Sequence, residues 1–185
     1  MIYSPSDHDD ASSLRIYRGM TLHQWSTRKG IARKGSEREA QLYAGETEVG
    51  AGDADVYVAG CVQNALTFTA MDSSANKLSW LSFSRDMTVA TFFALNELDE
   101  YDSEGGVVIE ASLAHLRDIG IACAPNDRRF PWEQEVSVDL FDHASFPESA
   151  IVKVHPVPYS ELWRAASKLQ SQWGGSGKYT RHVYA

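Results

Sequence analysis

The sequence predicts an α+β fold, because several strands and several helices follow one another without the regular strand–helix–strand alternation of doubly wound proteins. The chain has 185 residues, a length that suits one domain. Its hydrophobic content of 43% and charged content of 23% are ordinary for a globular protein with a core. We therefore expect a flexible N-terminus over residues 1–12 and a single domain over residues 13–185.

The N-terminal part of the domain is expected to begin with a strand at 14–18 that ends at Gly19. Thr21 is then placed as the N-cap of a helix, with Leu22 and Trp25 on one face. Farther along, residues 44–60 are rich in glycine and poor in large apolar side chains. This composition predicts a mobile loop that serves as a lid or an insertion.

The middle of the chain reads as a strand at 76–86 that runs into a turn, followed by a helix at 85–98. Ser84 is the expected N-cap, and Asp86 suits the first turn of this helix. Apolar residues cover most of its circumference, so the helix should be buried. These residues are Val89, Ala90, Phe92, Phe93 and Ala94.

The C-terminal half contains three further strands and two further helices. The expected strands are 104–113, 135–141 and 150–157, and the expected helices are 113–120, which Gly120 ends, and 159–173. The last helix carries apolar residues at helical spacing, namely Leu162, Trp163, Ala166, Leu169 and Trp173.

Composition also excludes some classes of function. The net charge of -8 argues against binding nucleic acid through bulk attraction. A local concentration of five basic residues at 28–38 leaves two interpretations, a solvated surface or a contact for an anion or a partner. No apolar run of about 18 residues predicts a membrane span. The polar, acidic start does not resemble a signal peptide, and export without a cleaved signal stays open.

The two cysteines, Cys61 and Cys123, make neither a disulfide framework nor a metal cluster, so no metal is expected. The six histidines are scattered, and no serine stands in a Gly-x-Ser-x-Gly turn. A Ser–His–Asp mechanism is therefore weakly supported.

Three short stretches carry candidate chemistry. In "LRIYRGM", Arg18 can bind phosphate through its guanidinium, and Gly19 leaves room for a ligand near the backbone. In "WLSFSRD", Ser82 and Ser84 lie two apart at a strand end, where a hydroxyl can hold a ribose or orient a carboxylate. Each also has an ordinary explanation, because Arg18 can be an exposed strand residue and Ser84 a helix cap.

The third stretch is "FPWEQEVSV", in which Glu133 and Glu135 lie one residue apart where a loop becomes a strand. Residues two apart in a strand point to the same face, so both carboxylates would project into one space. Carboxylates that close raise one another's pKa unless a cation is near. The pair is therefore either a solvated strand start or an acid/base site.

In this order and spacing, "IYRGM", "LSFSRDMTVATFFA" and "WEQEVSV" resemble the motifs of mono-ADP-ribosyltransferases of the arginine–serine–glutamate class. The resemblance runs from about residue 14 to residue 157. The chain departs from the family at Phe83, where threonine is common. Residues 44–70 match no part of the family pattern.

The resemblance implies a split β-sandwich with packed helices, and NAD⁺ bound in a cleft as the donor of ADP-ribose. Glu135 would stabilise the cationic transition state as nicotinamide leaves, Ser82 would position Glu135, and Arg18 would bind a phosphate of NAD⁺. The residues implied to contact NAD⁺ are Arg18, Gly19, Ser82, Ser84 and Phe93. Phe93 would stack on nicotinamide, although core burial is the better explanation for at least one of Phe92 and Phe93.

Glu133 implies an arginine acceptor, since family members with glutamate at this position modify arginine and members with glutamine modify other groups. A carboxylate can bind a guanidinium as a cation and then take its proton as it attacks, which an amide cannot do. Phe130 and Trp132 precede the two acids and are candidates for target recognition. Packing in the core is the alternative for both.

The resemblance therefore predicts a transferase that acts on a target protein, of the kind found in secreted bacterial toxins and virulence effectors. Such a domain would reach the cytoplasm of a target cell without a cleaved signal, and a cognate immunity or inhibitor protein is a further partner that it allows. Three alternatives stay open. They are an NAD glycohydrolase with the same site, transfer to a nucleic acid, and a binding module that has lost catalysis.

Overall fold

The computed structural model of the protein describes residues 14–28, 30–33, 35–44, 56–61, 65–66, 77–96, 105–126 and 131–173. The expected flexible N-terminus and Phe130 lie outside these residues. Within them the fold is α+β, as the sequence predicts. A six-stranded sheet forms its centre, and every neighbouring pair of its strands is antiparallel.

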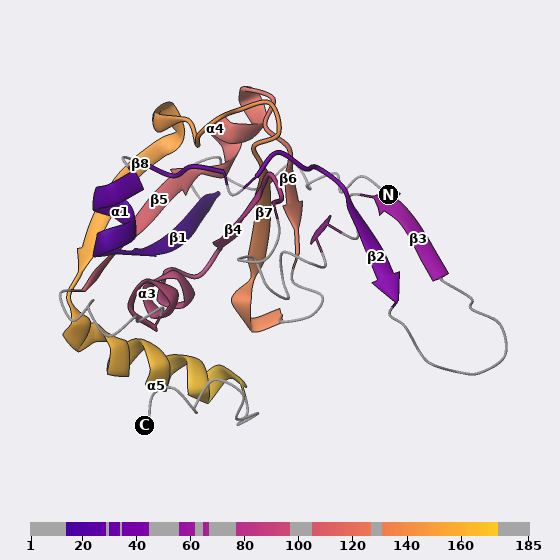
Figure 1. The fold of residues 1–185 in the computed structure, drawn as a ribbon. Helices are drawn as coiled ribbons and strands as arrows, with labels where there is room; N and C mark the ends of the chain where they lie inside the picture. The colour runs from indigo at the N-terminus through magenta and orange to yellow at the C-terminus, as the bar shows by residue number, and fades with distance from the viewer. Residues whose placement is uncertain are drawn as a thin grey trace, which may run out of the picture.

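The strands of this sheet lie in the order β6-β7-β4-β1-β5-β8 (Figure 1). Their bounds are β1 Arg15–Thr21, β4 Trp80–Ser84, β5 Gly106–Ser112, β6 Cys123–Pro125, β7 Glu135–Asp139 and β8 Ile151–Val157. β1 pairs with β5 along all seven of its residues but meets β4 at one position, Tyr17 opposite Ser84. The sheet thus consists of two three-stranded halves that join at one point. We call this junction the seam.

One face of the sheet is covered by α3 (Met87–Asn96), which packs against β1 and β5, and α5 (Leu162–Trp173) packs against α3 (Figure 1). The expectation that α3 is buried is confirmed by Val89, Ala90, Phe92, Ala94 and Leu95. On α5 the buried residues are Leu162, Ala165 and Leu169, whereas Trp163 is 51% exposed. Trp163, which the sequence pattern groups with the apolar residues of this helix, therefore lies outside the buried stripe, which runs through Ala165 instead.

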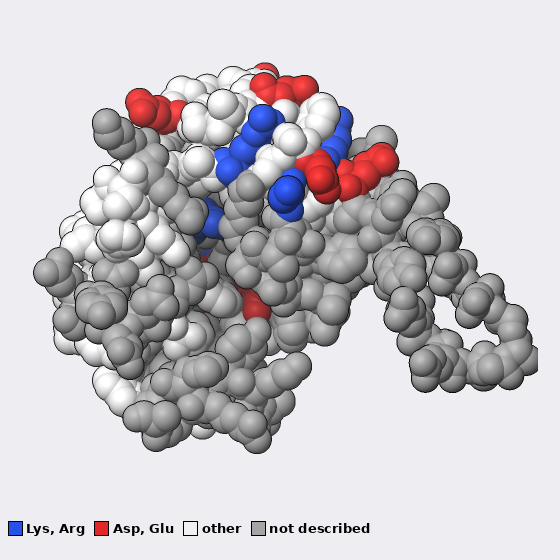
Figure 2. Space-filling view, in the orientation of Figure 1, with Lys and Arg blue, Asp and Glu red and all other residues white. Residues whose placement is uncertain are grey.

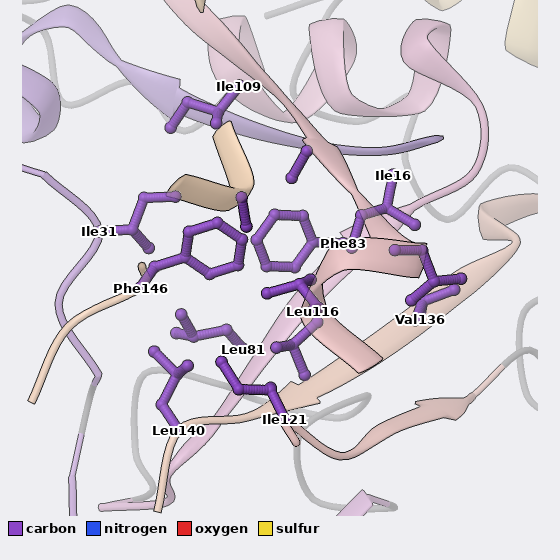
Figure 3. Close-up of a cluster of buried hydrophobic side chains, with 14 of the residues drawn as sticks. Ile16, Ile31, Leu81, Phe83, Ile109, Leu116, Ile121, Val136, Leu140 and Phe146 are labelled. Atoms are coloured by element: carbon purple, nitrogen blue, oxygen red, sulfur yellow. The ribbon is translucent and has the colours of Figure 1, made fainter. Parts of the chain in front are cut away.

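The opposite face holds the larger hydrophobic core. Phe83 of β4 packs on Phe146 with ring centroids 5.1 Å apart, and Ile16, Leu116 and Val136 surround the pair (Figure 3). Burying a side chain such as Phe83 contributes about 1.5–3 kcal/mol. The short helix α4 (Leu113–Asp118) supplies Leu116, and Leu22 and Trp25 of α1 (Leu22–Arg28) pack at the margin.

Most expected elements are found, with corrections at their ends. The capping of α1 by Thr21 is confirmed, because the Thr21 hydroxyl accepts from the Gln24 amide (3.0 Å) and the Gln24 side chain accepts from the Thr21 amide (3.3 Å). The prediction that Gly19 ends the first strand is wrong, since β1 continues to Thr21. Gly120, with a φ of 83°, follows α4 as expected.

The interpretation of 44–60 as a loop is wrong in part. β3 (Val56–Cys61) pairs with β2 (Ala40–Ala44) in a separate two-stranded sheet, which extends from one side of the body in Figure 1. Alternation in "VYV" is a strand signal that the glycines on either side obscure. The remaining elements are short 3₁₀ turns: η1 (Pro131–Glu133), η2 (Glu148–Ala150) and η3 (Tyr159–Glu161).

The close packing of α3 on β1 depends on Gly19. A β-carbon at this position would overlap the Ala90 carbonyl oxygen and lie 2.6 Å from the Ala94 amide nitrogen. This packing is a structural reason for the glycine that the sequence does not show, and contact of Gly19 with a ligand stays a prediction. The space beside Gly19 is occupied by the backbone of α3.

We predict that Gly19→Ala lowers the free energy of unfolding by at least about 1–3 kcal/mol, because the helix must move away from the strand. Gly120→Ala is the matched control. Its φ is positive, but no atom lies within 4 Å of the added carbon. It should cost only the strain of a left-handed residue, about 1–2 kcal/mol. Urea unfolding measures both, and a smaller loss for Gly19→Ala than for Gly120→Ala would contradict the prediction.

Candidate functional site

The site begins at the seam, where Arg18 joins the two halves of the sheet. Its guanidinium donates to the Ser82 carbonyl oxygen at 2.6 Å and lies 6.0 Å from the centre of the Phe83 ring. Both contacts occur just past the single backbone pairing of β1 with β4. A cationic side chain therefore links the strands at a point where their backbones no longer pair.

Glu135 is the first residue of β7 and lies opposite Ser84 of β4. It is 5% exposed, and the Ser137 hydroxyl donates to its Oε1 at 3.1 Å. Burial raises the pKa of Glu135, while hydrogen bonds from Ser82, Asn126 and Ser137 and the charge of Arg18 lower it. Several donors and one cation thus converge on a carboxyl group that has little contact with water.

The three residues on which the sequence interpretation depends therefore lie together. Arg18 comes from β1, Ser82 from β4 and Glu135 from β7, and these strands are neighbours in the sheet. Ser82 and Ser137 lie opposite each other in the register, so their side chains share the sheet face of Glu135. Apolar clusters flank this polar strip, with Tyr17 and Trp132 on one side and Trp80 and Leu66 on the other.

Glu133 lies near Glu135 for a different structural reason from the one that the sequence predicts. It does not belong to the strand, because it ends the 3₁₀ turn η1, and Gln134 then adopts a left-handed conformation with a φ of 45°. The argument from strand alternation is therefore wrong for this pair. The two acids nevertheless interact, since burial first and then the charge of Glu135 raise the pKa of Glu133 to about 8.

Ser84 holds this turn against β4. Its hydroxyl donates to the Glu133 carbonyl oxygen at 2.6 Å and accepts from the Asp86 amide at 2.9 Å. The Arg85 amide adds a bond to the Gln134 carbonyl oxygen at 3.1 Å. The N-cap of α3 is Asp86, whose carboxylate accepts from the Thr88 amide at 2.7 Å. The expectation that Ser84 caps the helix is wrong, because α3 begins two residues later than that assignment requires.

The aromatic candidates for the site are Phe93, Trp132 and Phe130, and the structure describes the first two. Phe93 and Trp132 are both half-buried and pack against the cluster formed by α3 and α5, and Phe93 contacts the edge of Phe92 at a centroid distance of 5.8 Å. These contacts agree with the core-packing alternative for Trp132. Phe130 lies outside the described residues, so its assignment to target recognition stays a prediction.

Two residues of the site were not among the sequence candidates. Ser137 has a usable signal, since it lies two residues after Glu135 in a strand and must share its face. Asn126 has none. It follows β6, a three-residue strand that the sequence pattern does not show, and pairing of β6 with β7 brings it beside Glu135.

The basic stretch 28–38 makes contacts within the chain. Arg38 binds the buried carboxylate of Asp139 at 2.8 Å, and Arg33 donates to the Phe141 carbonyl oxygen at 2.8 Å. Figure 2 shows one face of the molecule, and over its upper part basic side chains are interspersed with acidic ones rather than forming a continuous basic patch. These contacts favour a structural role for part of the stretch over a nucleic-acid surface.

The described residues contain no group of three or more His, Cys, Asp or Glu side chains that would hold a metal ion. Among the same residues, no helix combines the length and hydropathy that crossing a membrane requires. The sequence matches no protein-family model, and a search of curated proteins finds no significant match. The chemistry of the site therefore has to be argued from its own geometry.

That geometry suits the stabilisation of a positive charge. A carboxylate in a poorly solvated site attracts a cation more strongly than it would in water. The donors around Glu135 fix its orientation in advance, so little rearrangement is needed when a charge develops next to it. Glu133 adds a second carboxyl group that holds a proton at neutral pH and releases it when a cation arrives.

We predict that Gln134→Val lowers the free energy of unfolding by about 1–2 kcal/mol, because a branched side chain is strained in the left-handed region. Gln134→Gly should be neutral within about 1 kcal/mol, since glycine adopts this conformation without strain. Thermal or urea unfolding compares the two variants. Equal stability of both would show that the conformation of residue 134 is not a constraint.

The proton on Glu133 also predicts how stability depends on pH. Its pKa is raised from about 4.5 to about 8, so in this window the folded chain binds more protons than the unfolded chain. The free energy of unfolding therefore falls as pH rises from 5 to 8, by no more than a few kcal/mol, since each pKa unit is worth about 1.4 kcal/mol. Urea unfolding at several pH values measures the slope.

Glu133→Gln should flatten this dependence, because the amide carries no titrating proton and no longer repels Glu135. Glu148→Gln, at an exposed position in η2, is the control and should keep the wild-type slope. An unchanged slope in Glu133→Gln would exclude Glu133 as its source.

Proposed function

We propose that the protein is an NAD-dependent mono-ADP-ribosyltransferase that transfers ADP-ribose to an arginine side chain of a target protein and acts as a toxin or effector. The observation that carries the proposal is the convergence of Arg18, Ser82 and Glu135 from three separate motifs on one place in the sheet. The split β-sandwich fold is part of the proposal. It is supported by the division of the sheet into two halves at the seam.

In this reaction the glycosidic C–N bond of NAD⁺ breaks, and its electron pair leaves with nicotinamide. The ribose becomes positively charged at the transition state, and the carboxylate of Glu135 would stabilise that charge. Ser82 would hold Glu135 and contact the ribose. Arg18 would contribute a fixed positive charge for a phosphate of NAD⁺, while its bond to the Ser82 carbonyl keeps it at the seam.

The second acid would act on the acceptor. Glu133 is protonated at neutral pH in the free protein, and the arrival of an arginine cation favours its ionised form. The carboxylate would then take a proton from the guanidinium as a nitrogen atom forms the new bond to the ribose. Ser84 would keep Glu133 in place, because it holds the backbone of the turn.

An NAD glycohydrolase is the second candidate, and one observation favours it. Until a cation binds nearby, Glu133 holds its proton at neutral pH and is a poor base, whereas cleavage itself requires only Glu135. Water would then attack the ribose in place of arginine. Incubation with labelled NAD⁺ and a cell lysate separates the candidates, since label on protein supports transfer and free ADP-ribose alone supports hydrolysis. If nuclease removes the labelled product, the acceptor is a nucleic acid.

We predict that Glu135→Ala abolishes all release of nicotinamide, because the transition-state cation loses its counter-charge. Glu133→Gln should retain slow release of nicotinamide and lose transfer to protein. Glu148→Ala is the control and should keep both activities. Chromatography measures nicotinamide and labelled protein measures transfer. Equal loss of both activities in Glu133→Gln would refute separate roles, and full release by Glu135→Ala would refute the proposed site.

A further inference from the structure

Ser137 and Asn126 form a chain of hydrogen bonds that ends on Glu135. Ser137 is fully buried on β7, and its hydroxyl oxygen accepts from the Asn126 side-chain amide at 3.2 Å. The same hydroxyl donates its proton to Glu135 Oε1 at 3.1 Å. A serine hydroxyl has one proton, so the amide fixes the direction in which that proton points.

The orientation of the Asn126 amide is itself determined by the structure. Its nitrogen lies 2.9 Å from the Leu66 carbonyl oxygen, which can only accept a hydrogen bond. The NH₂ group must therefore face Leu66, because the reversed amide would place two oxygens together. The backbone amide of Asn126 donates to the Glu135 carbonyl oxygen at 2.8 Å, which fixes Asn126 relative to β7.

This arrangement is more elaborate than burying a polar residue requires. A buried hydroxyl needs only one acceptor, and a nearby backbone carbonyl would serve. Here the Asn126 amide, just past the end of β6, donates to the Ser137 hydroxyl in the middle of β7, and that hydroxyl donates to the carboxyl group of Glu135. Chains of hydrogen bonds of this kind strengthen one another in surroundings of low polarity.

We propose that Asn126 and Ser137 are positioning residues that fix the direction of the Glu135 carboxylate through their chain of hydrogen bonds. Only the effect of this role on activity rests on the proposed function. Asn126 acts through Ser137, because the two protons of its NH₂ group are donated to the Leu66 carbonyl oxygen and to the Ser137 hydroxyl. Neither residue contacts the reacting atoms. The charged groups that act on Glu135 are Arg18 from β1 and the carboxyl of Glu133 from η1, and Ser82 from β4 is the remaining neutral donor.

The test measures the titration of Glu135 directly, by NMR of protein labelled with ¹³C in its glutamate side chains. The NMR signal of Glu135 is assigned as the one that is missing from the spectrum of Glu135→Gln. In Asn126→Ala and in Ser137→Ala, the pKa of Glu135 should rise by about one, because each variant removes a donor to the charged form. Asn126→Asp should raise it at least as far, since a carboxylate of the same shape replaces the donor with an acceptor.

The acidic limb of the pH profile for nicotinamide release should move to higher pH by the same amount. At a pH well below the pKa of Glu135, this corresponds to a rate up to about tenfold lower, with recovery at high pH. The double variant Asn126→Ala/Ser137→Ala should shift the pKa by less than the sum of the two single variants, because part of the effect of Asn126 passes through Ser137.

Ser79→Ala is the matched control. The Ser79 hydroxyl donates to the buried carboxylate of Asp139 at 2.7 Å, a similar pair farther along β7. Its loss should lower stability and leave the pKa of Glu135 unchanged. If Asn126→Asp folds with a wild-type pKa at Glu135, the positioning role is wrong, because a residue of equal shape would then suffice.

The two proposals fail in different ways. A raised pKa of Glu135 in the variants, together with no nicotinamide release by the wild-type protein, would uphold the positioning role and refute the proposed function. If the wild type releases nicotinamide but the pKa of Glu135 and the pH profile are unchanged in all three single variants, the release would support the proposed function and the positioning role would be refuted.

Discussion

The bond between the Arg18 guanidinium and the Ser82 carbonyl oxygen is the interaction on which the site depends. β1 and β4 pair at one position, so the sheet would otherwise have little to hold its halves in register there. A long cationic side chain can join strands that have moved apart, which a backbone amide cannot do. Arg18 thereby places a cation at the seam, within a sheet whose other pairings extend over several residues.

The position of the seam explains why a carboxylate can be buried beside it. An isolated buried charge costs several kcal/mol, and the cost falls only when donors or a cation are near. Glu135 has both, since Arg18 supplies a positive charge and neighbouring side chains supply hydrogen-bond donors. Burial and the charge of Glu135 raise the pKa of Glu133 to about 8, so its carboxyl group keeps its proton at neutral pH. Burial therefore raises the pKa of both acids, but hydrogen-bond donors and a cation oppose this shift at Glu135.

The sequence predicts those parts of the fold that depend on local pattern. The burial of α3 follows from its apolar circumference, the cap at Thr21 from a hydroxyl three residues before a glutamine, and the strand at Glu135 from alternation. Arg18, Ser82 and Glu135 could be named because each stands in a recognisable motif. Their proximity depends on strand order, which no local pattern encodes.

Other features escape prediction because they result from contacts between distant segments. Gly19 is required by the backbone of α3, which lies about 70 residues later in the chain. Asn126 reaches the site through β6, whose three residues are too few to show alternation. The cap at Asp86 and the left-handed Gln134 depend on one another through Ser84 and Arg85, which tie the two turns together.

The left-handed conformation of Gln134 places the two acids in different backbone elements, although the charge of one still acts on the other. Glu135 belongs to the sheet, whereas Glu133 lies in the short turn η1, which is held by hydrogen bonds from Ser84 and Arg85 and by the packing of Trp132. Evolution can therefore remodel that turn, in length or in composition, while the sheet stays intact. In the proposed enzyme, the choice of acceptor would then be free to diversify among descendants that all break the same bond.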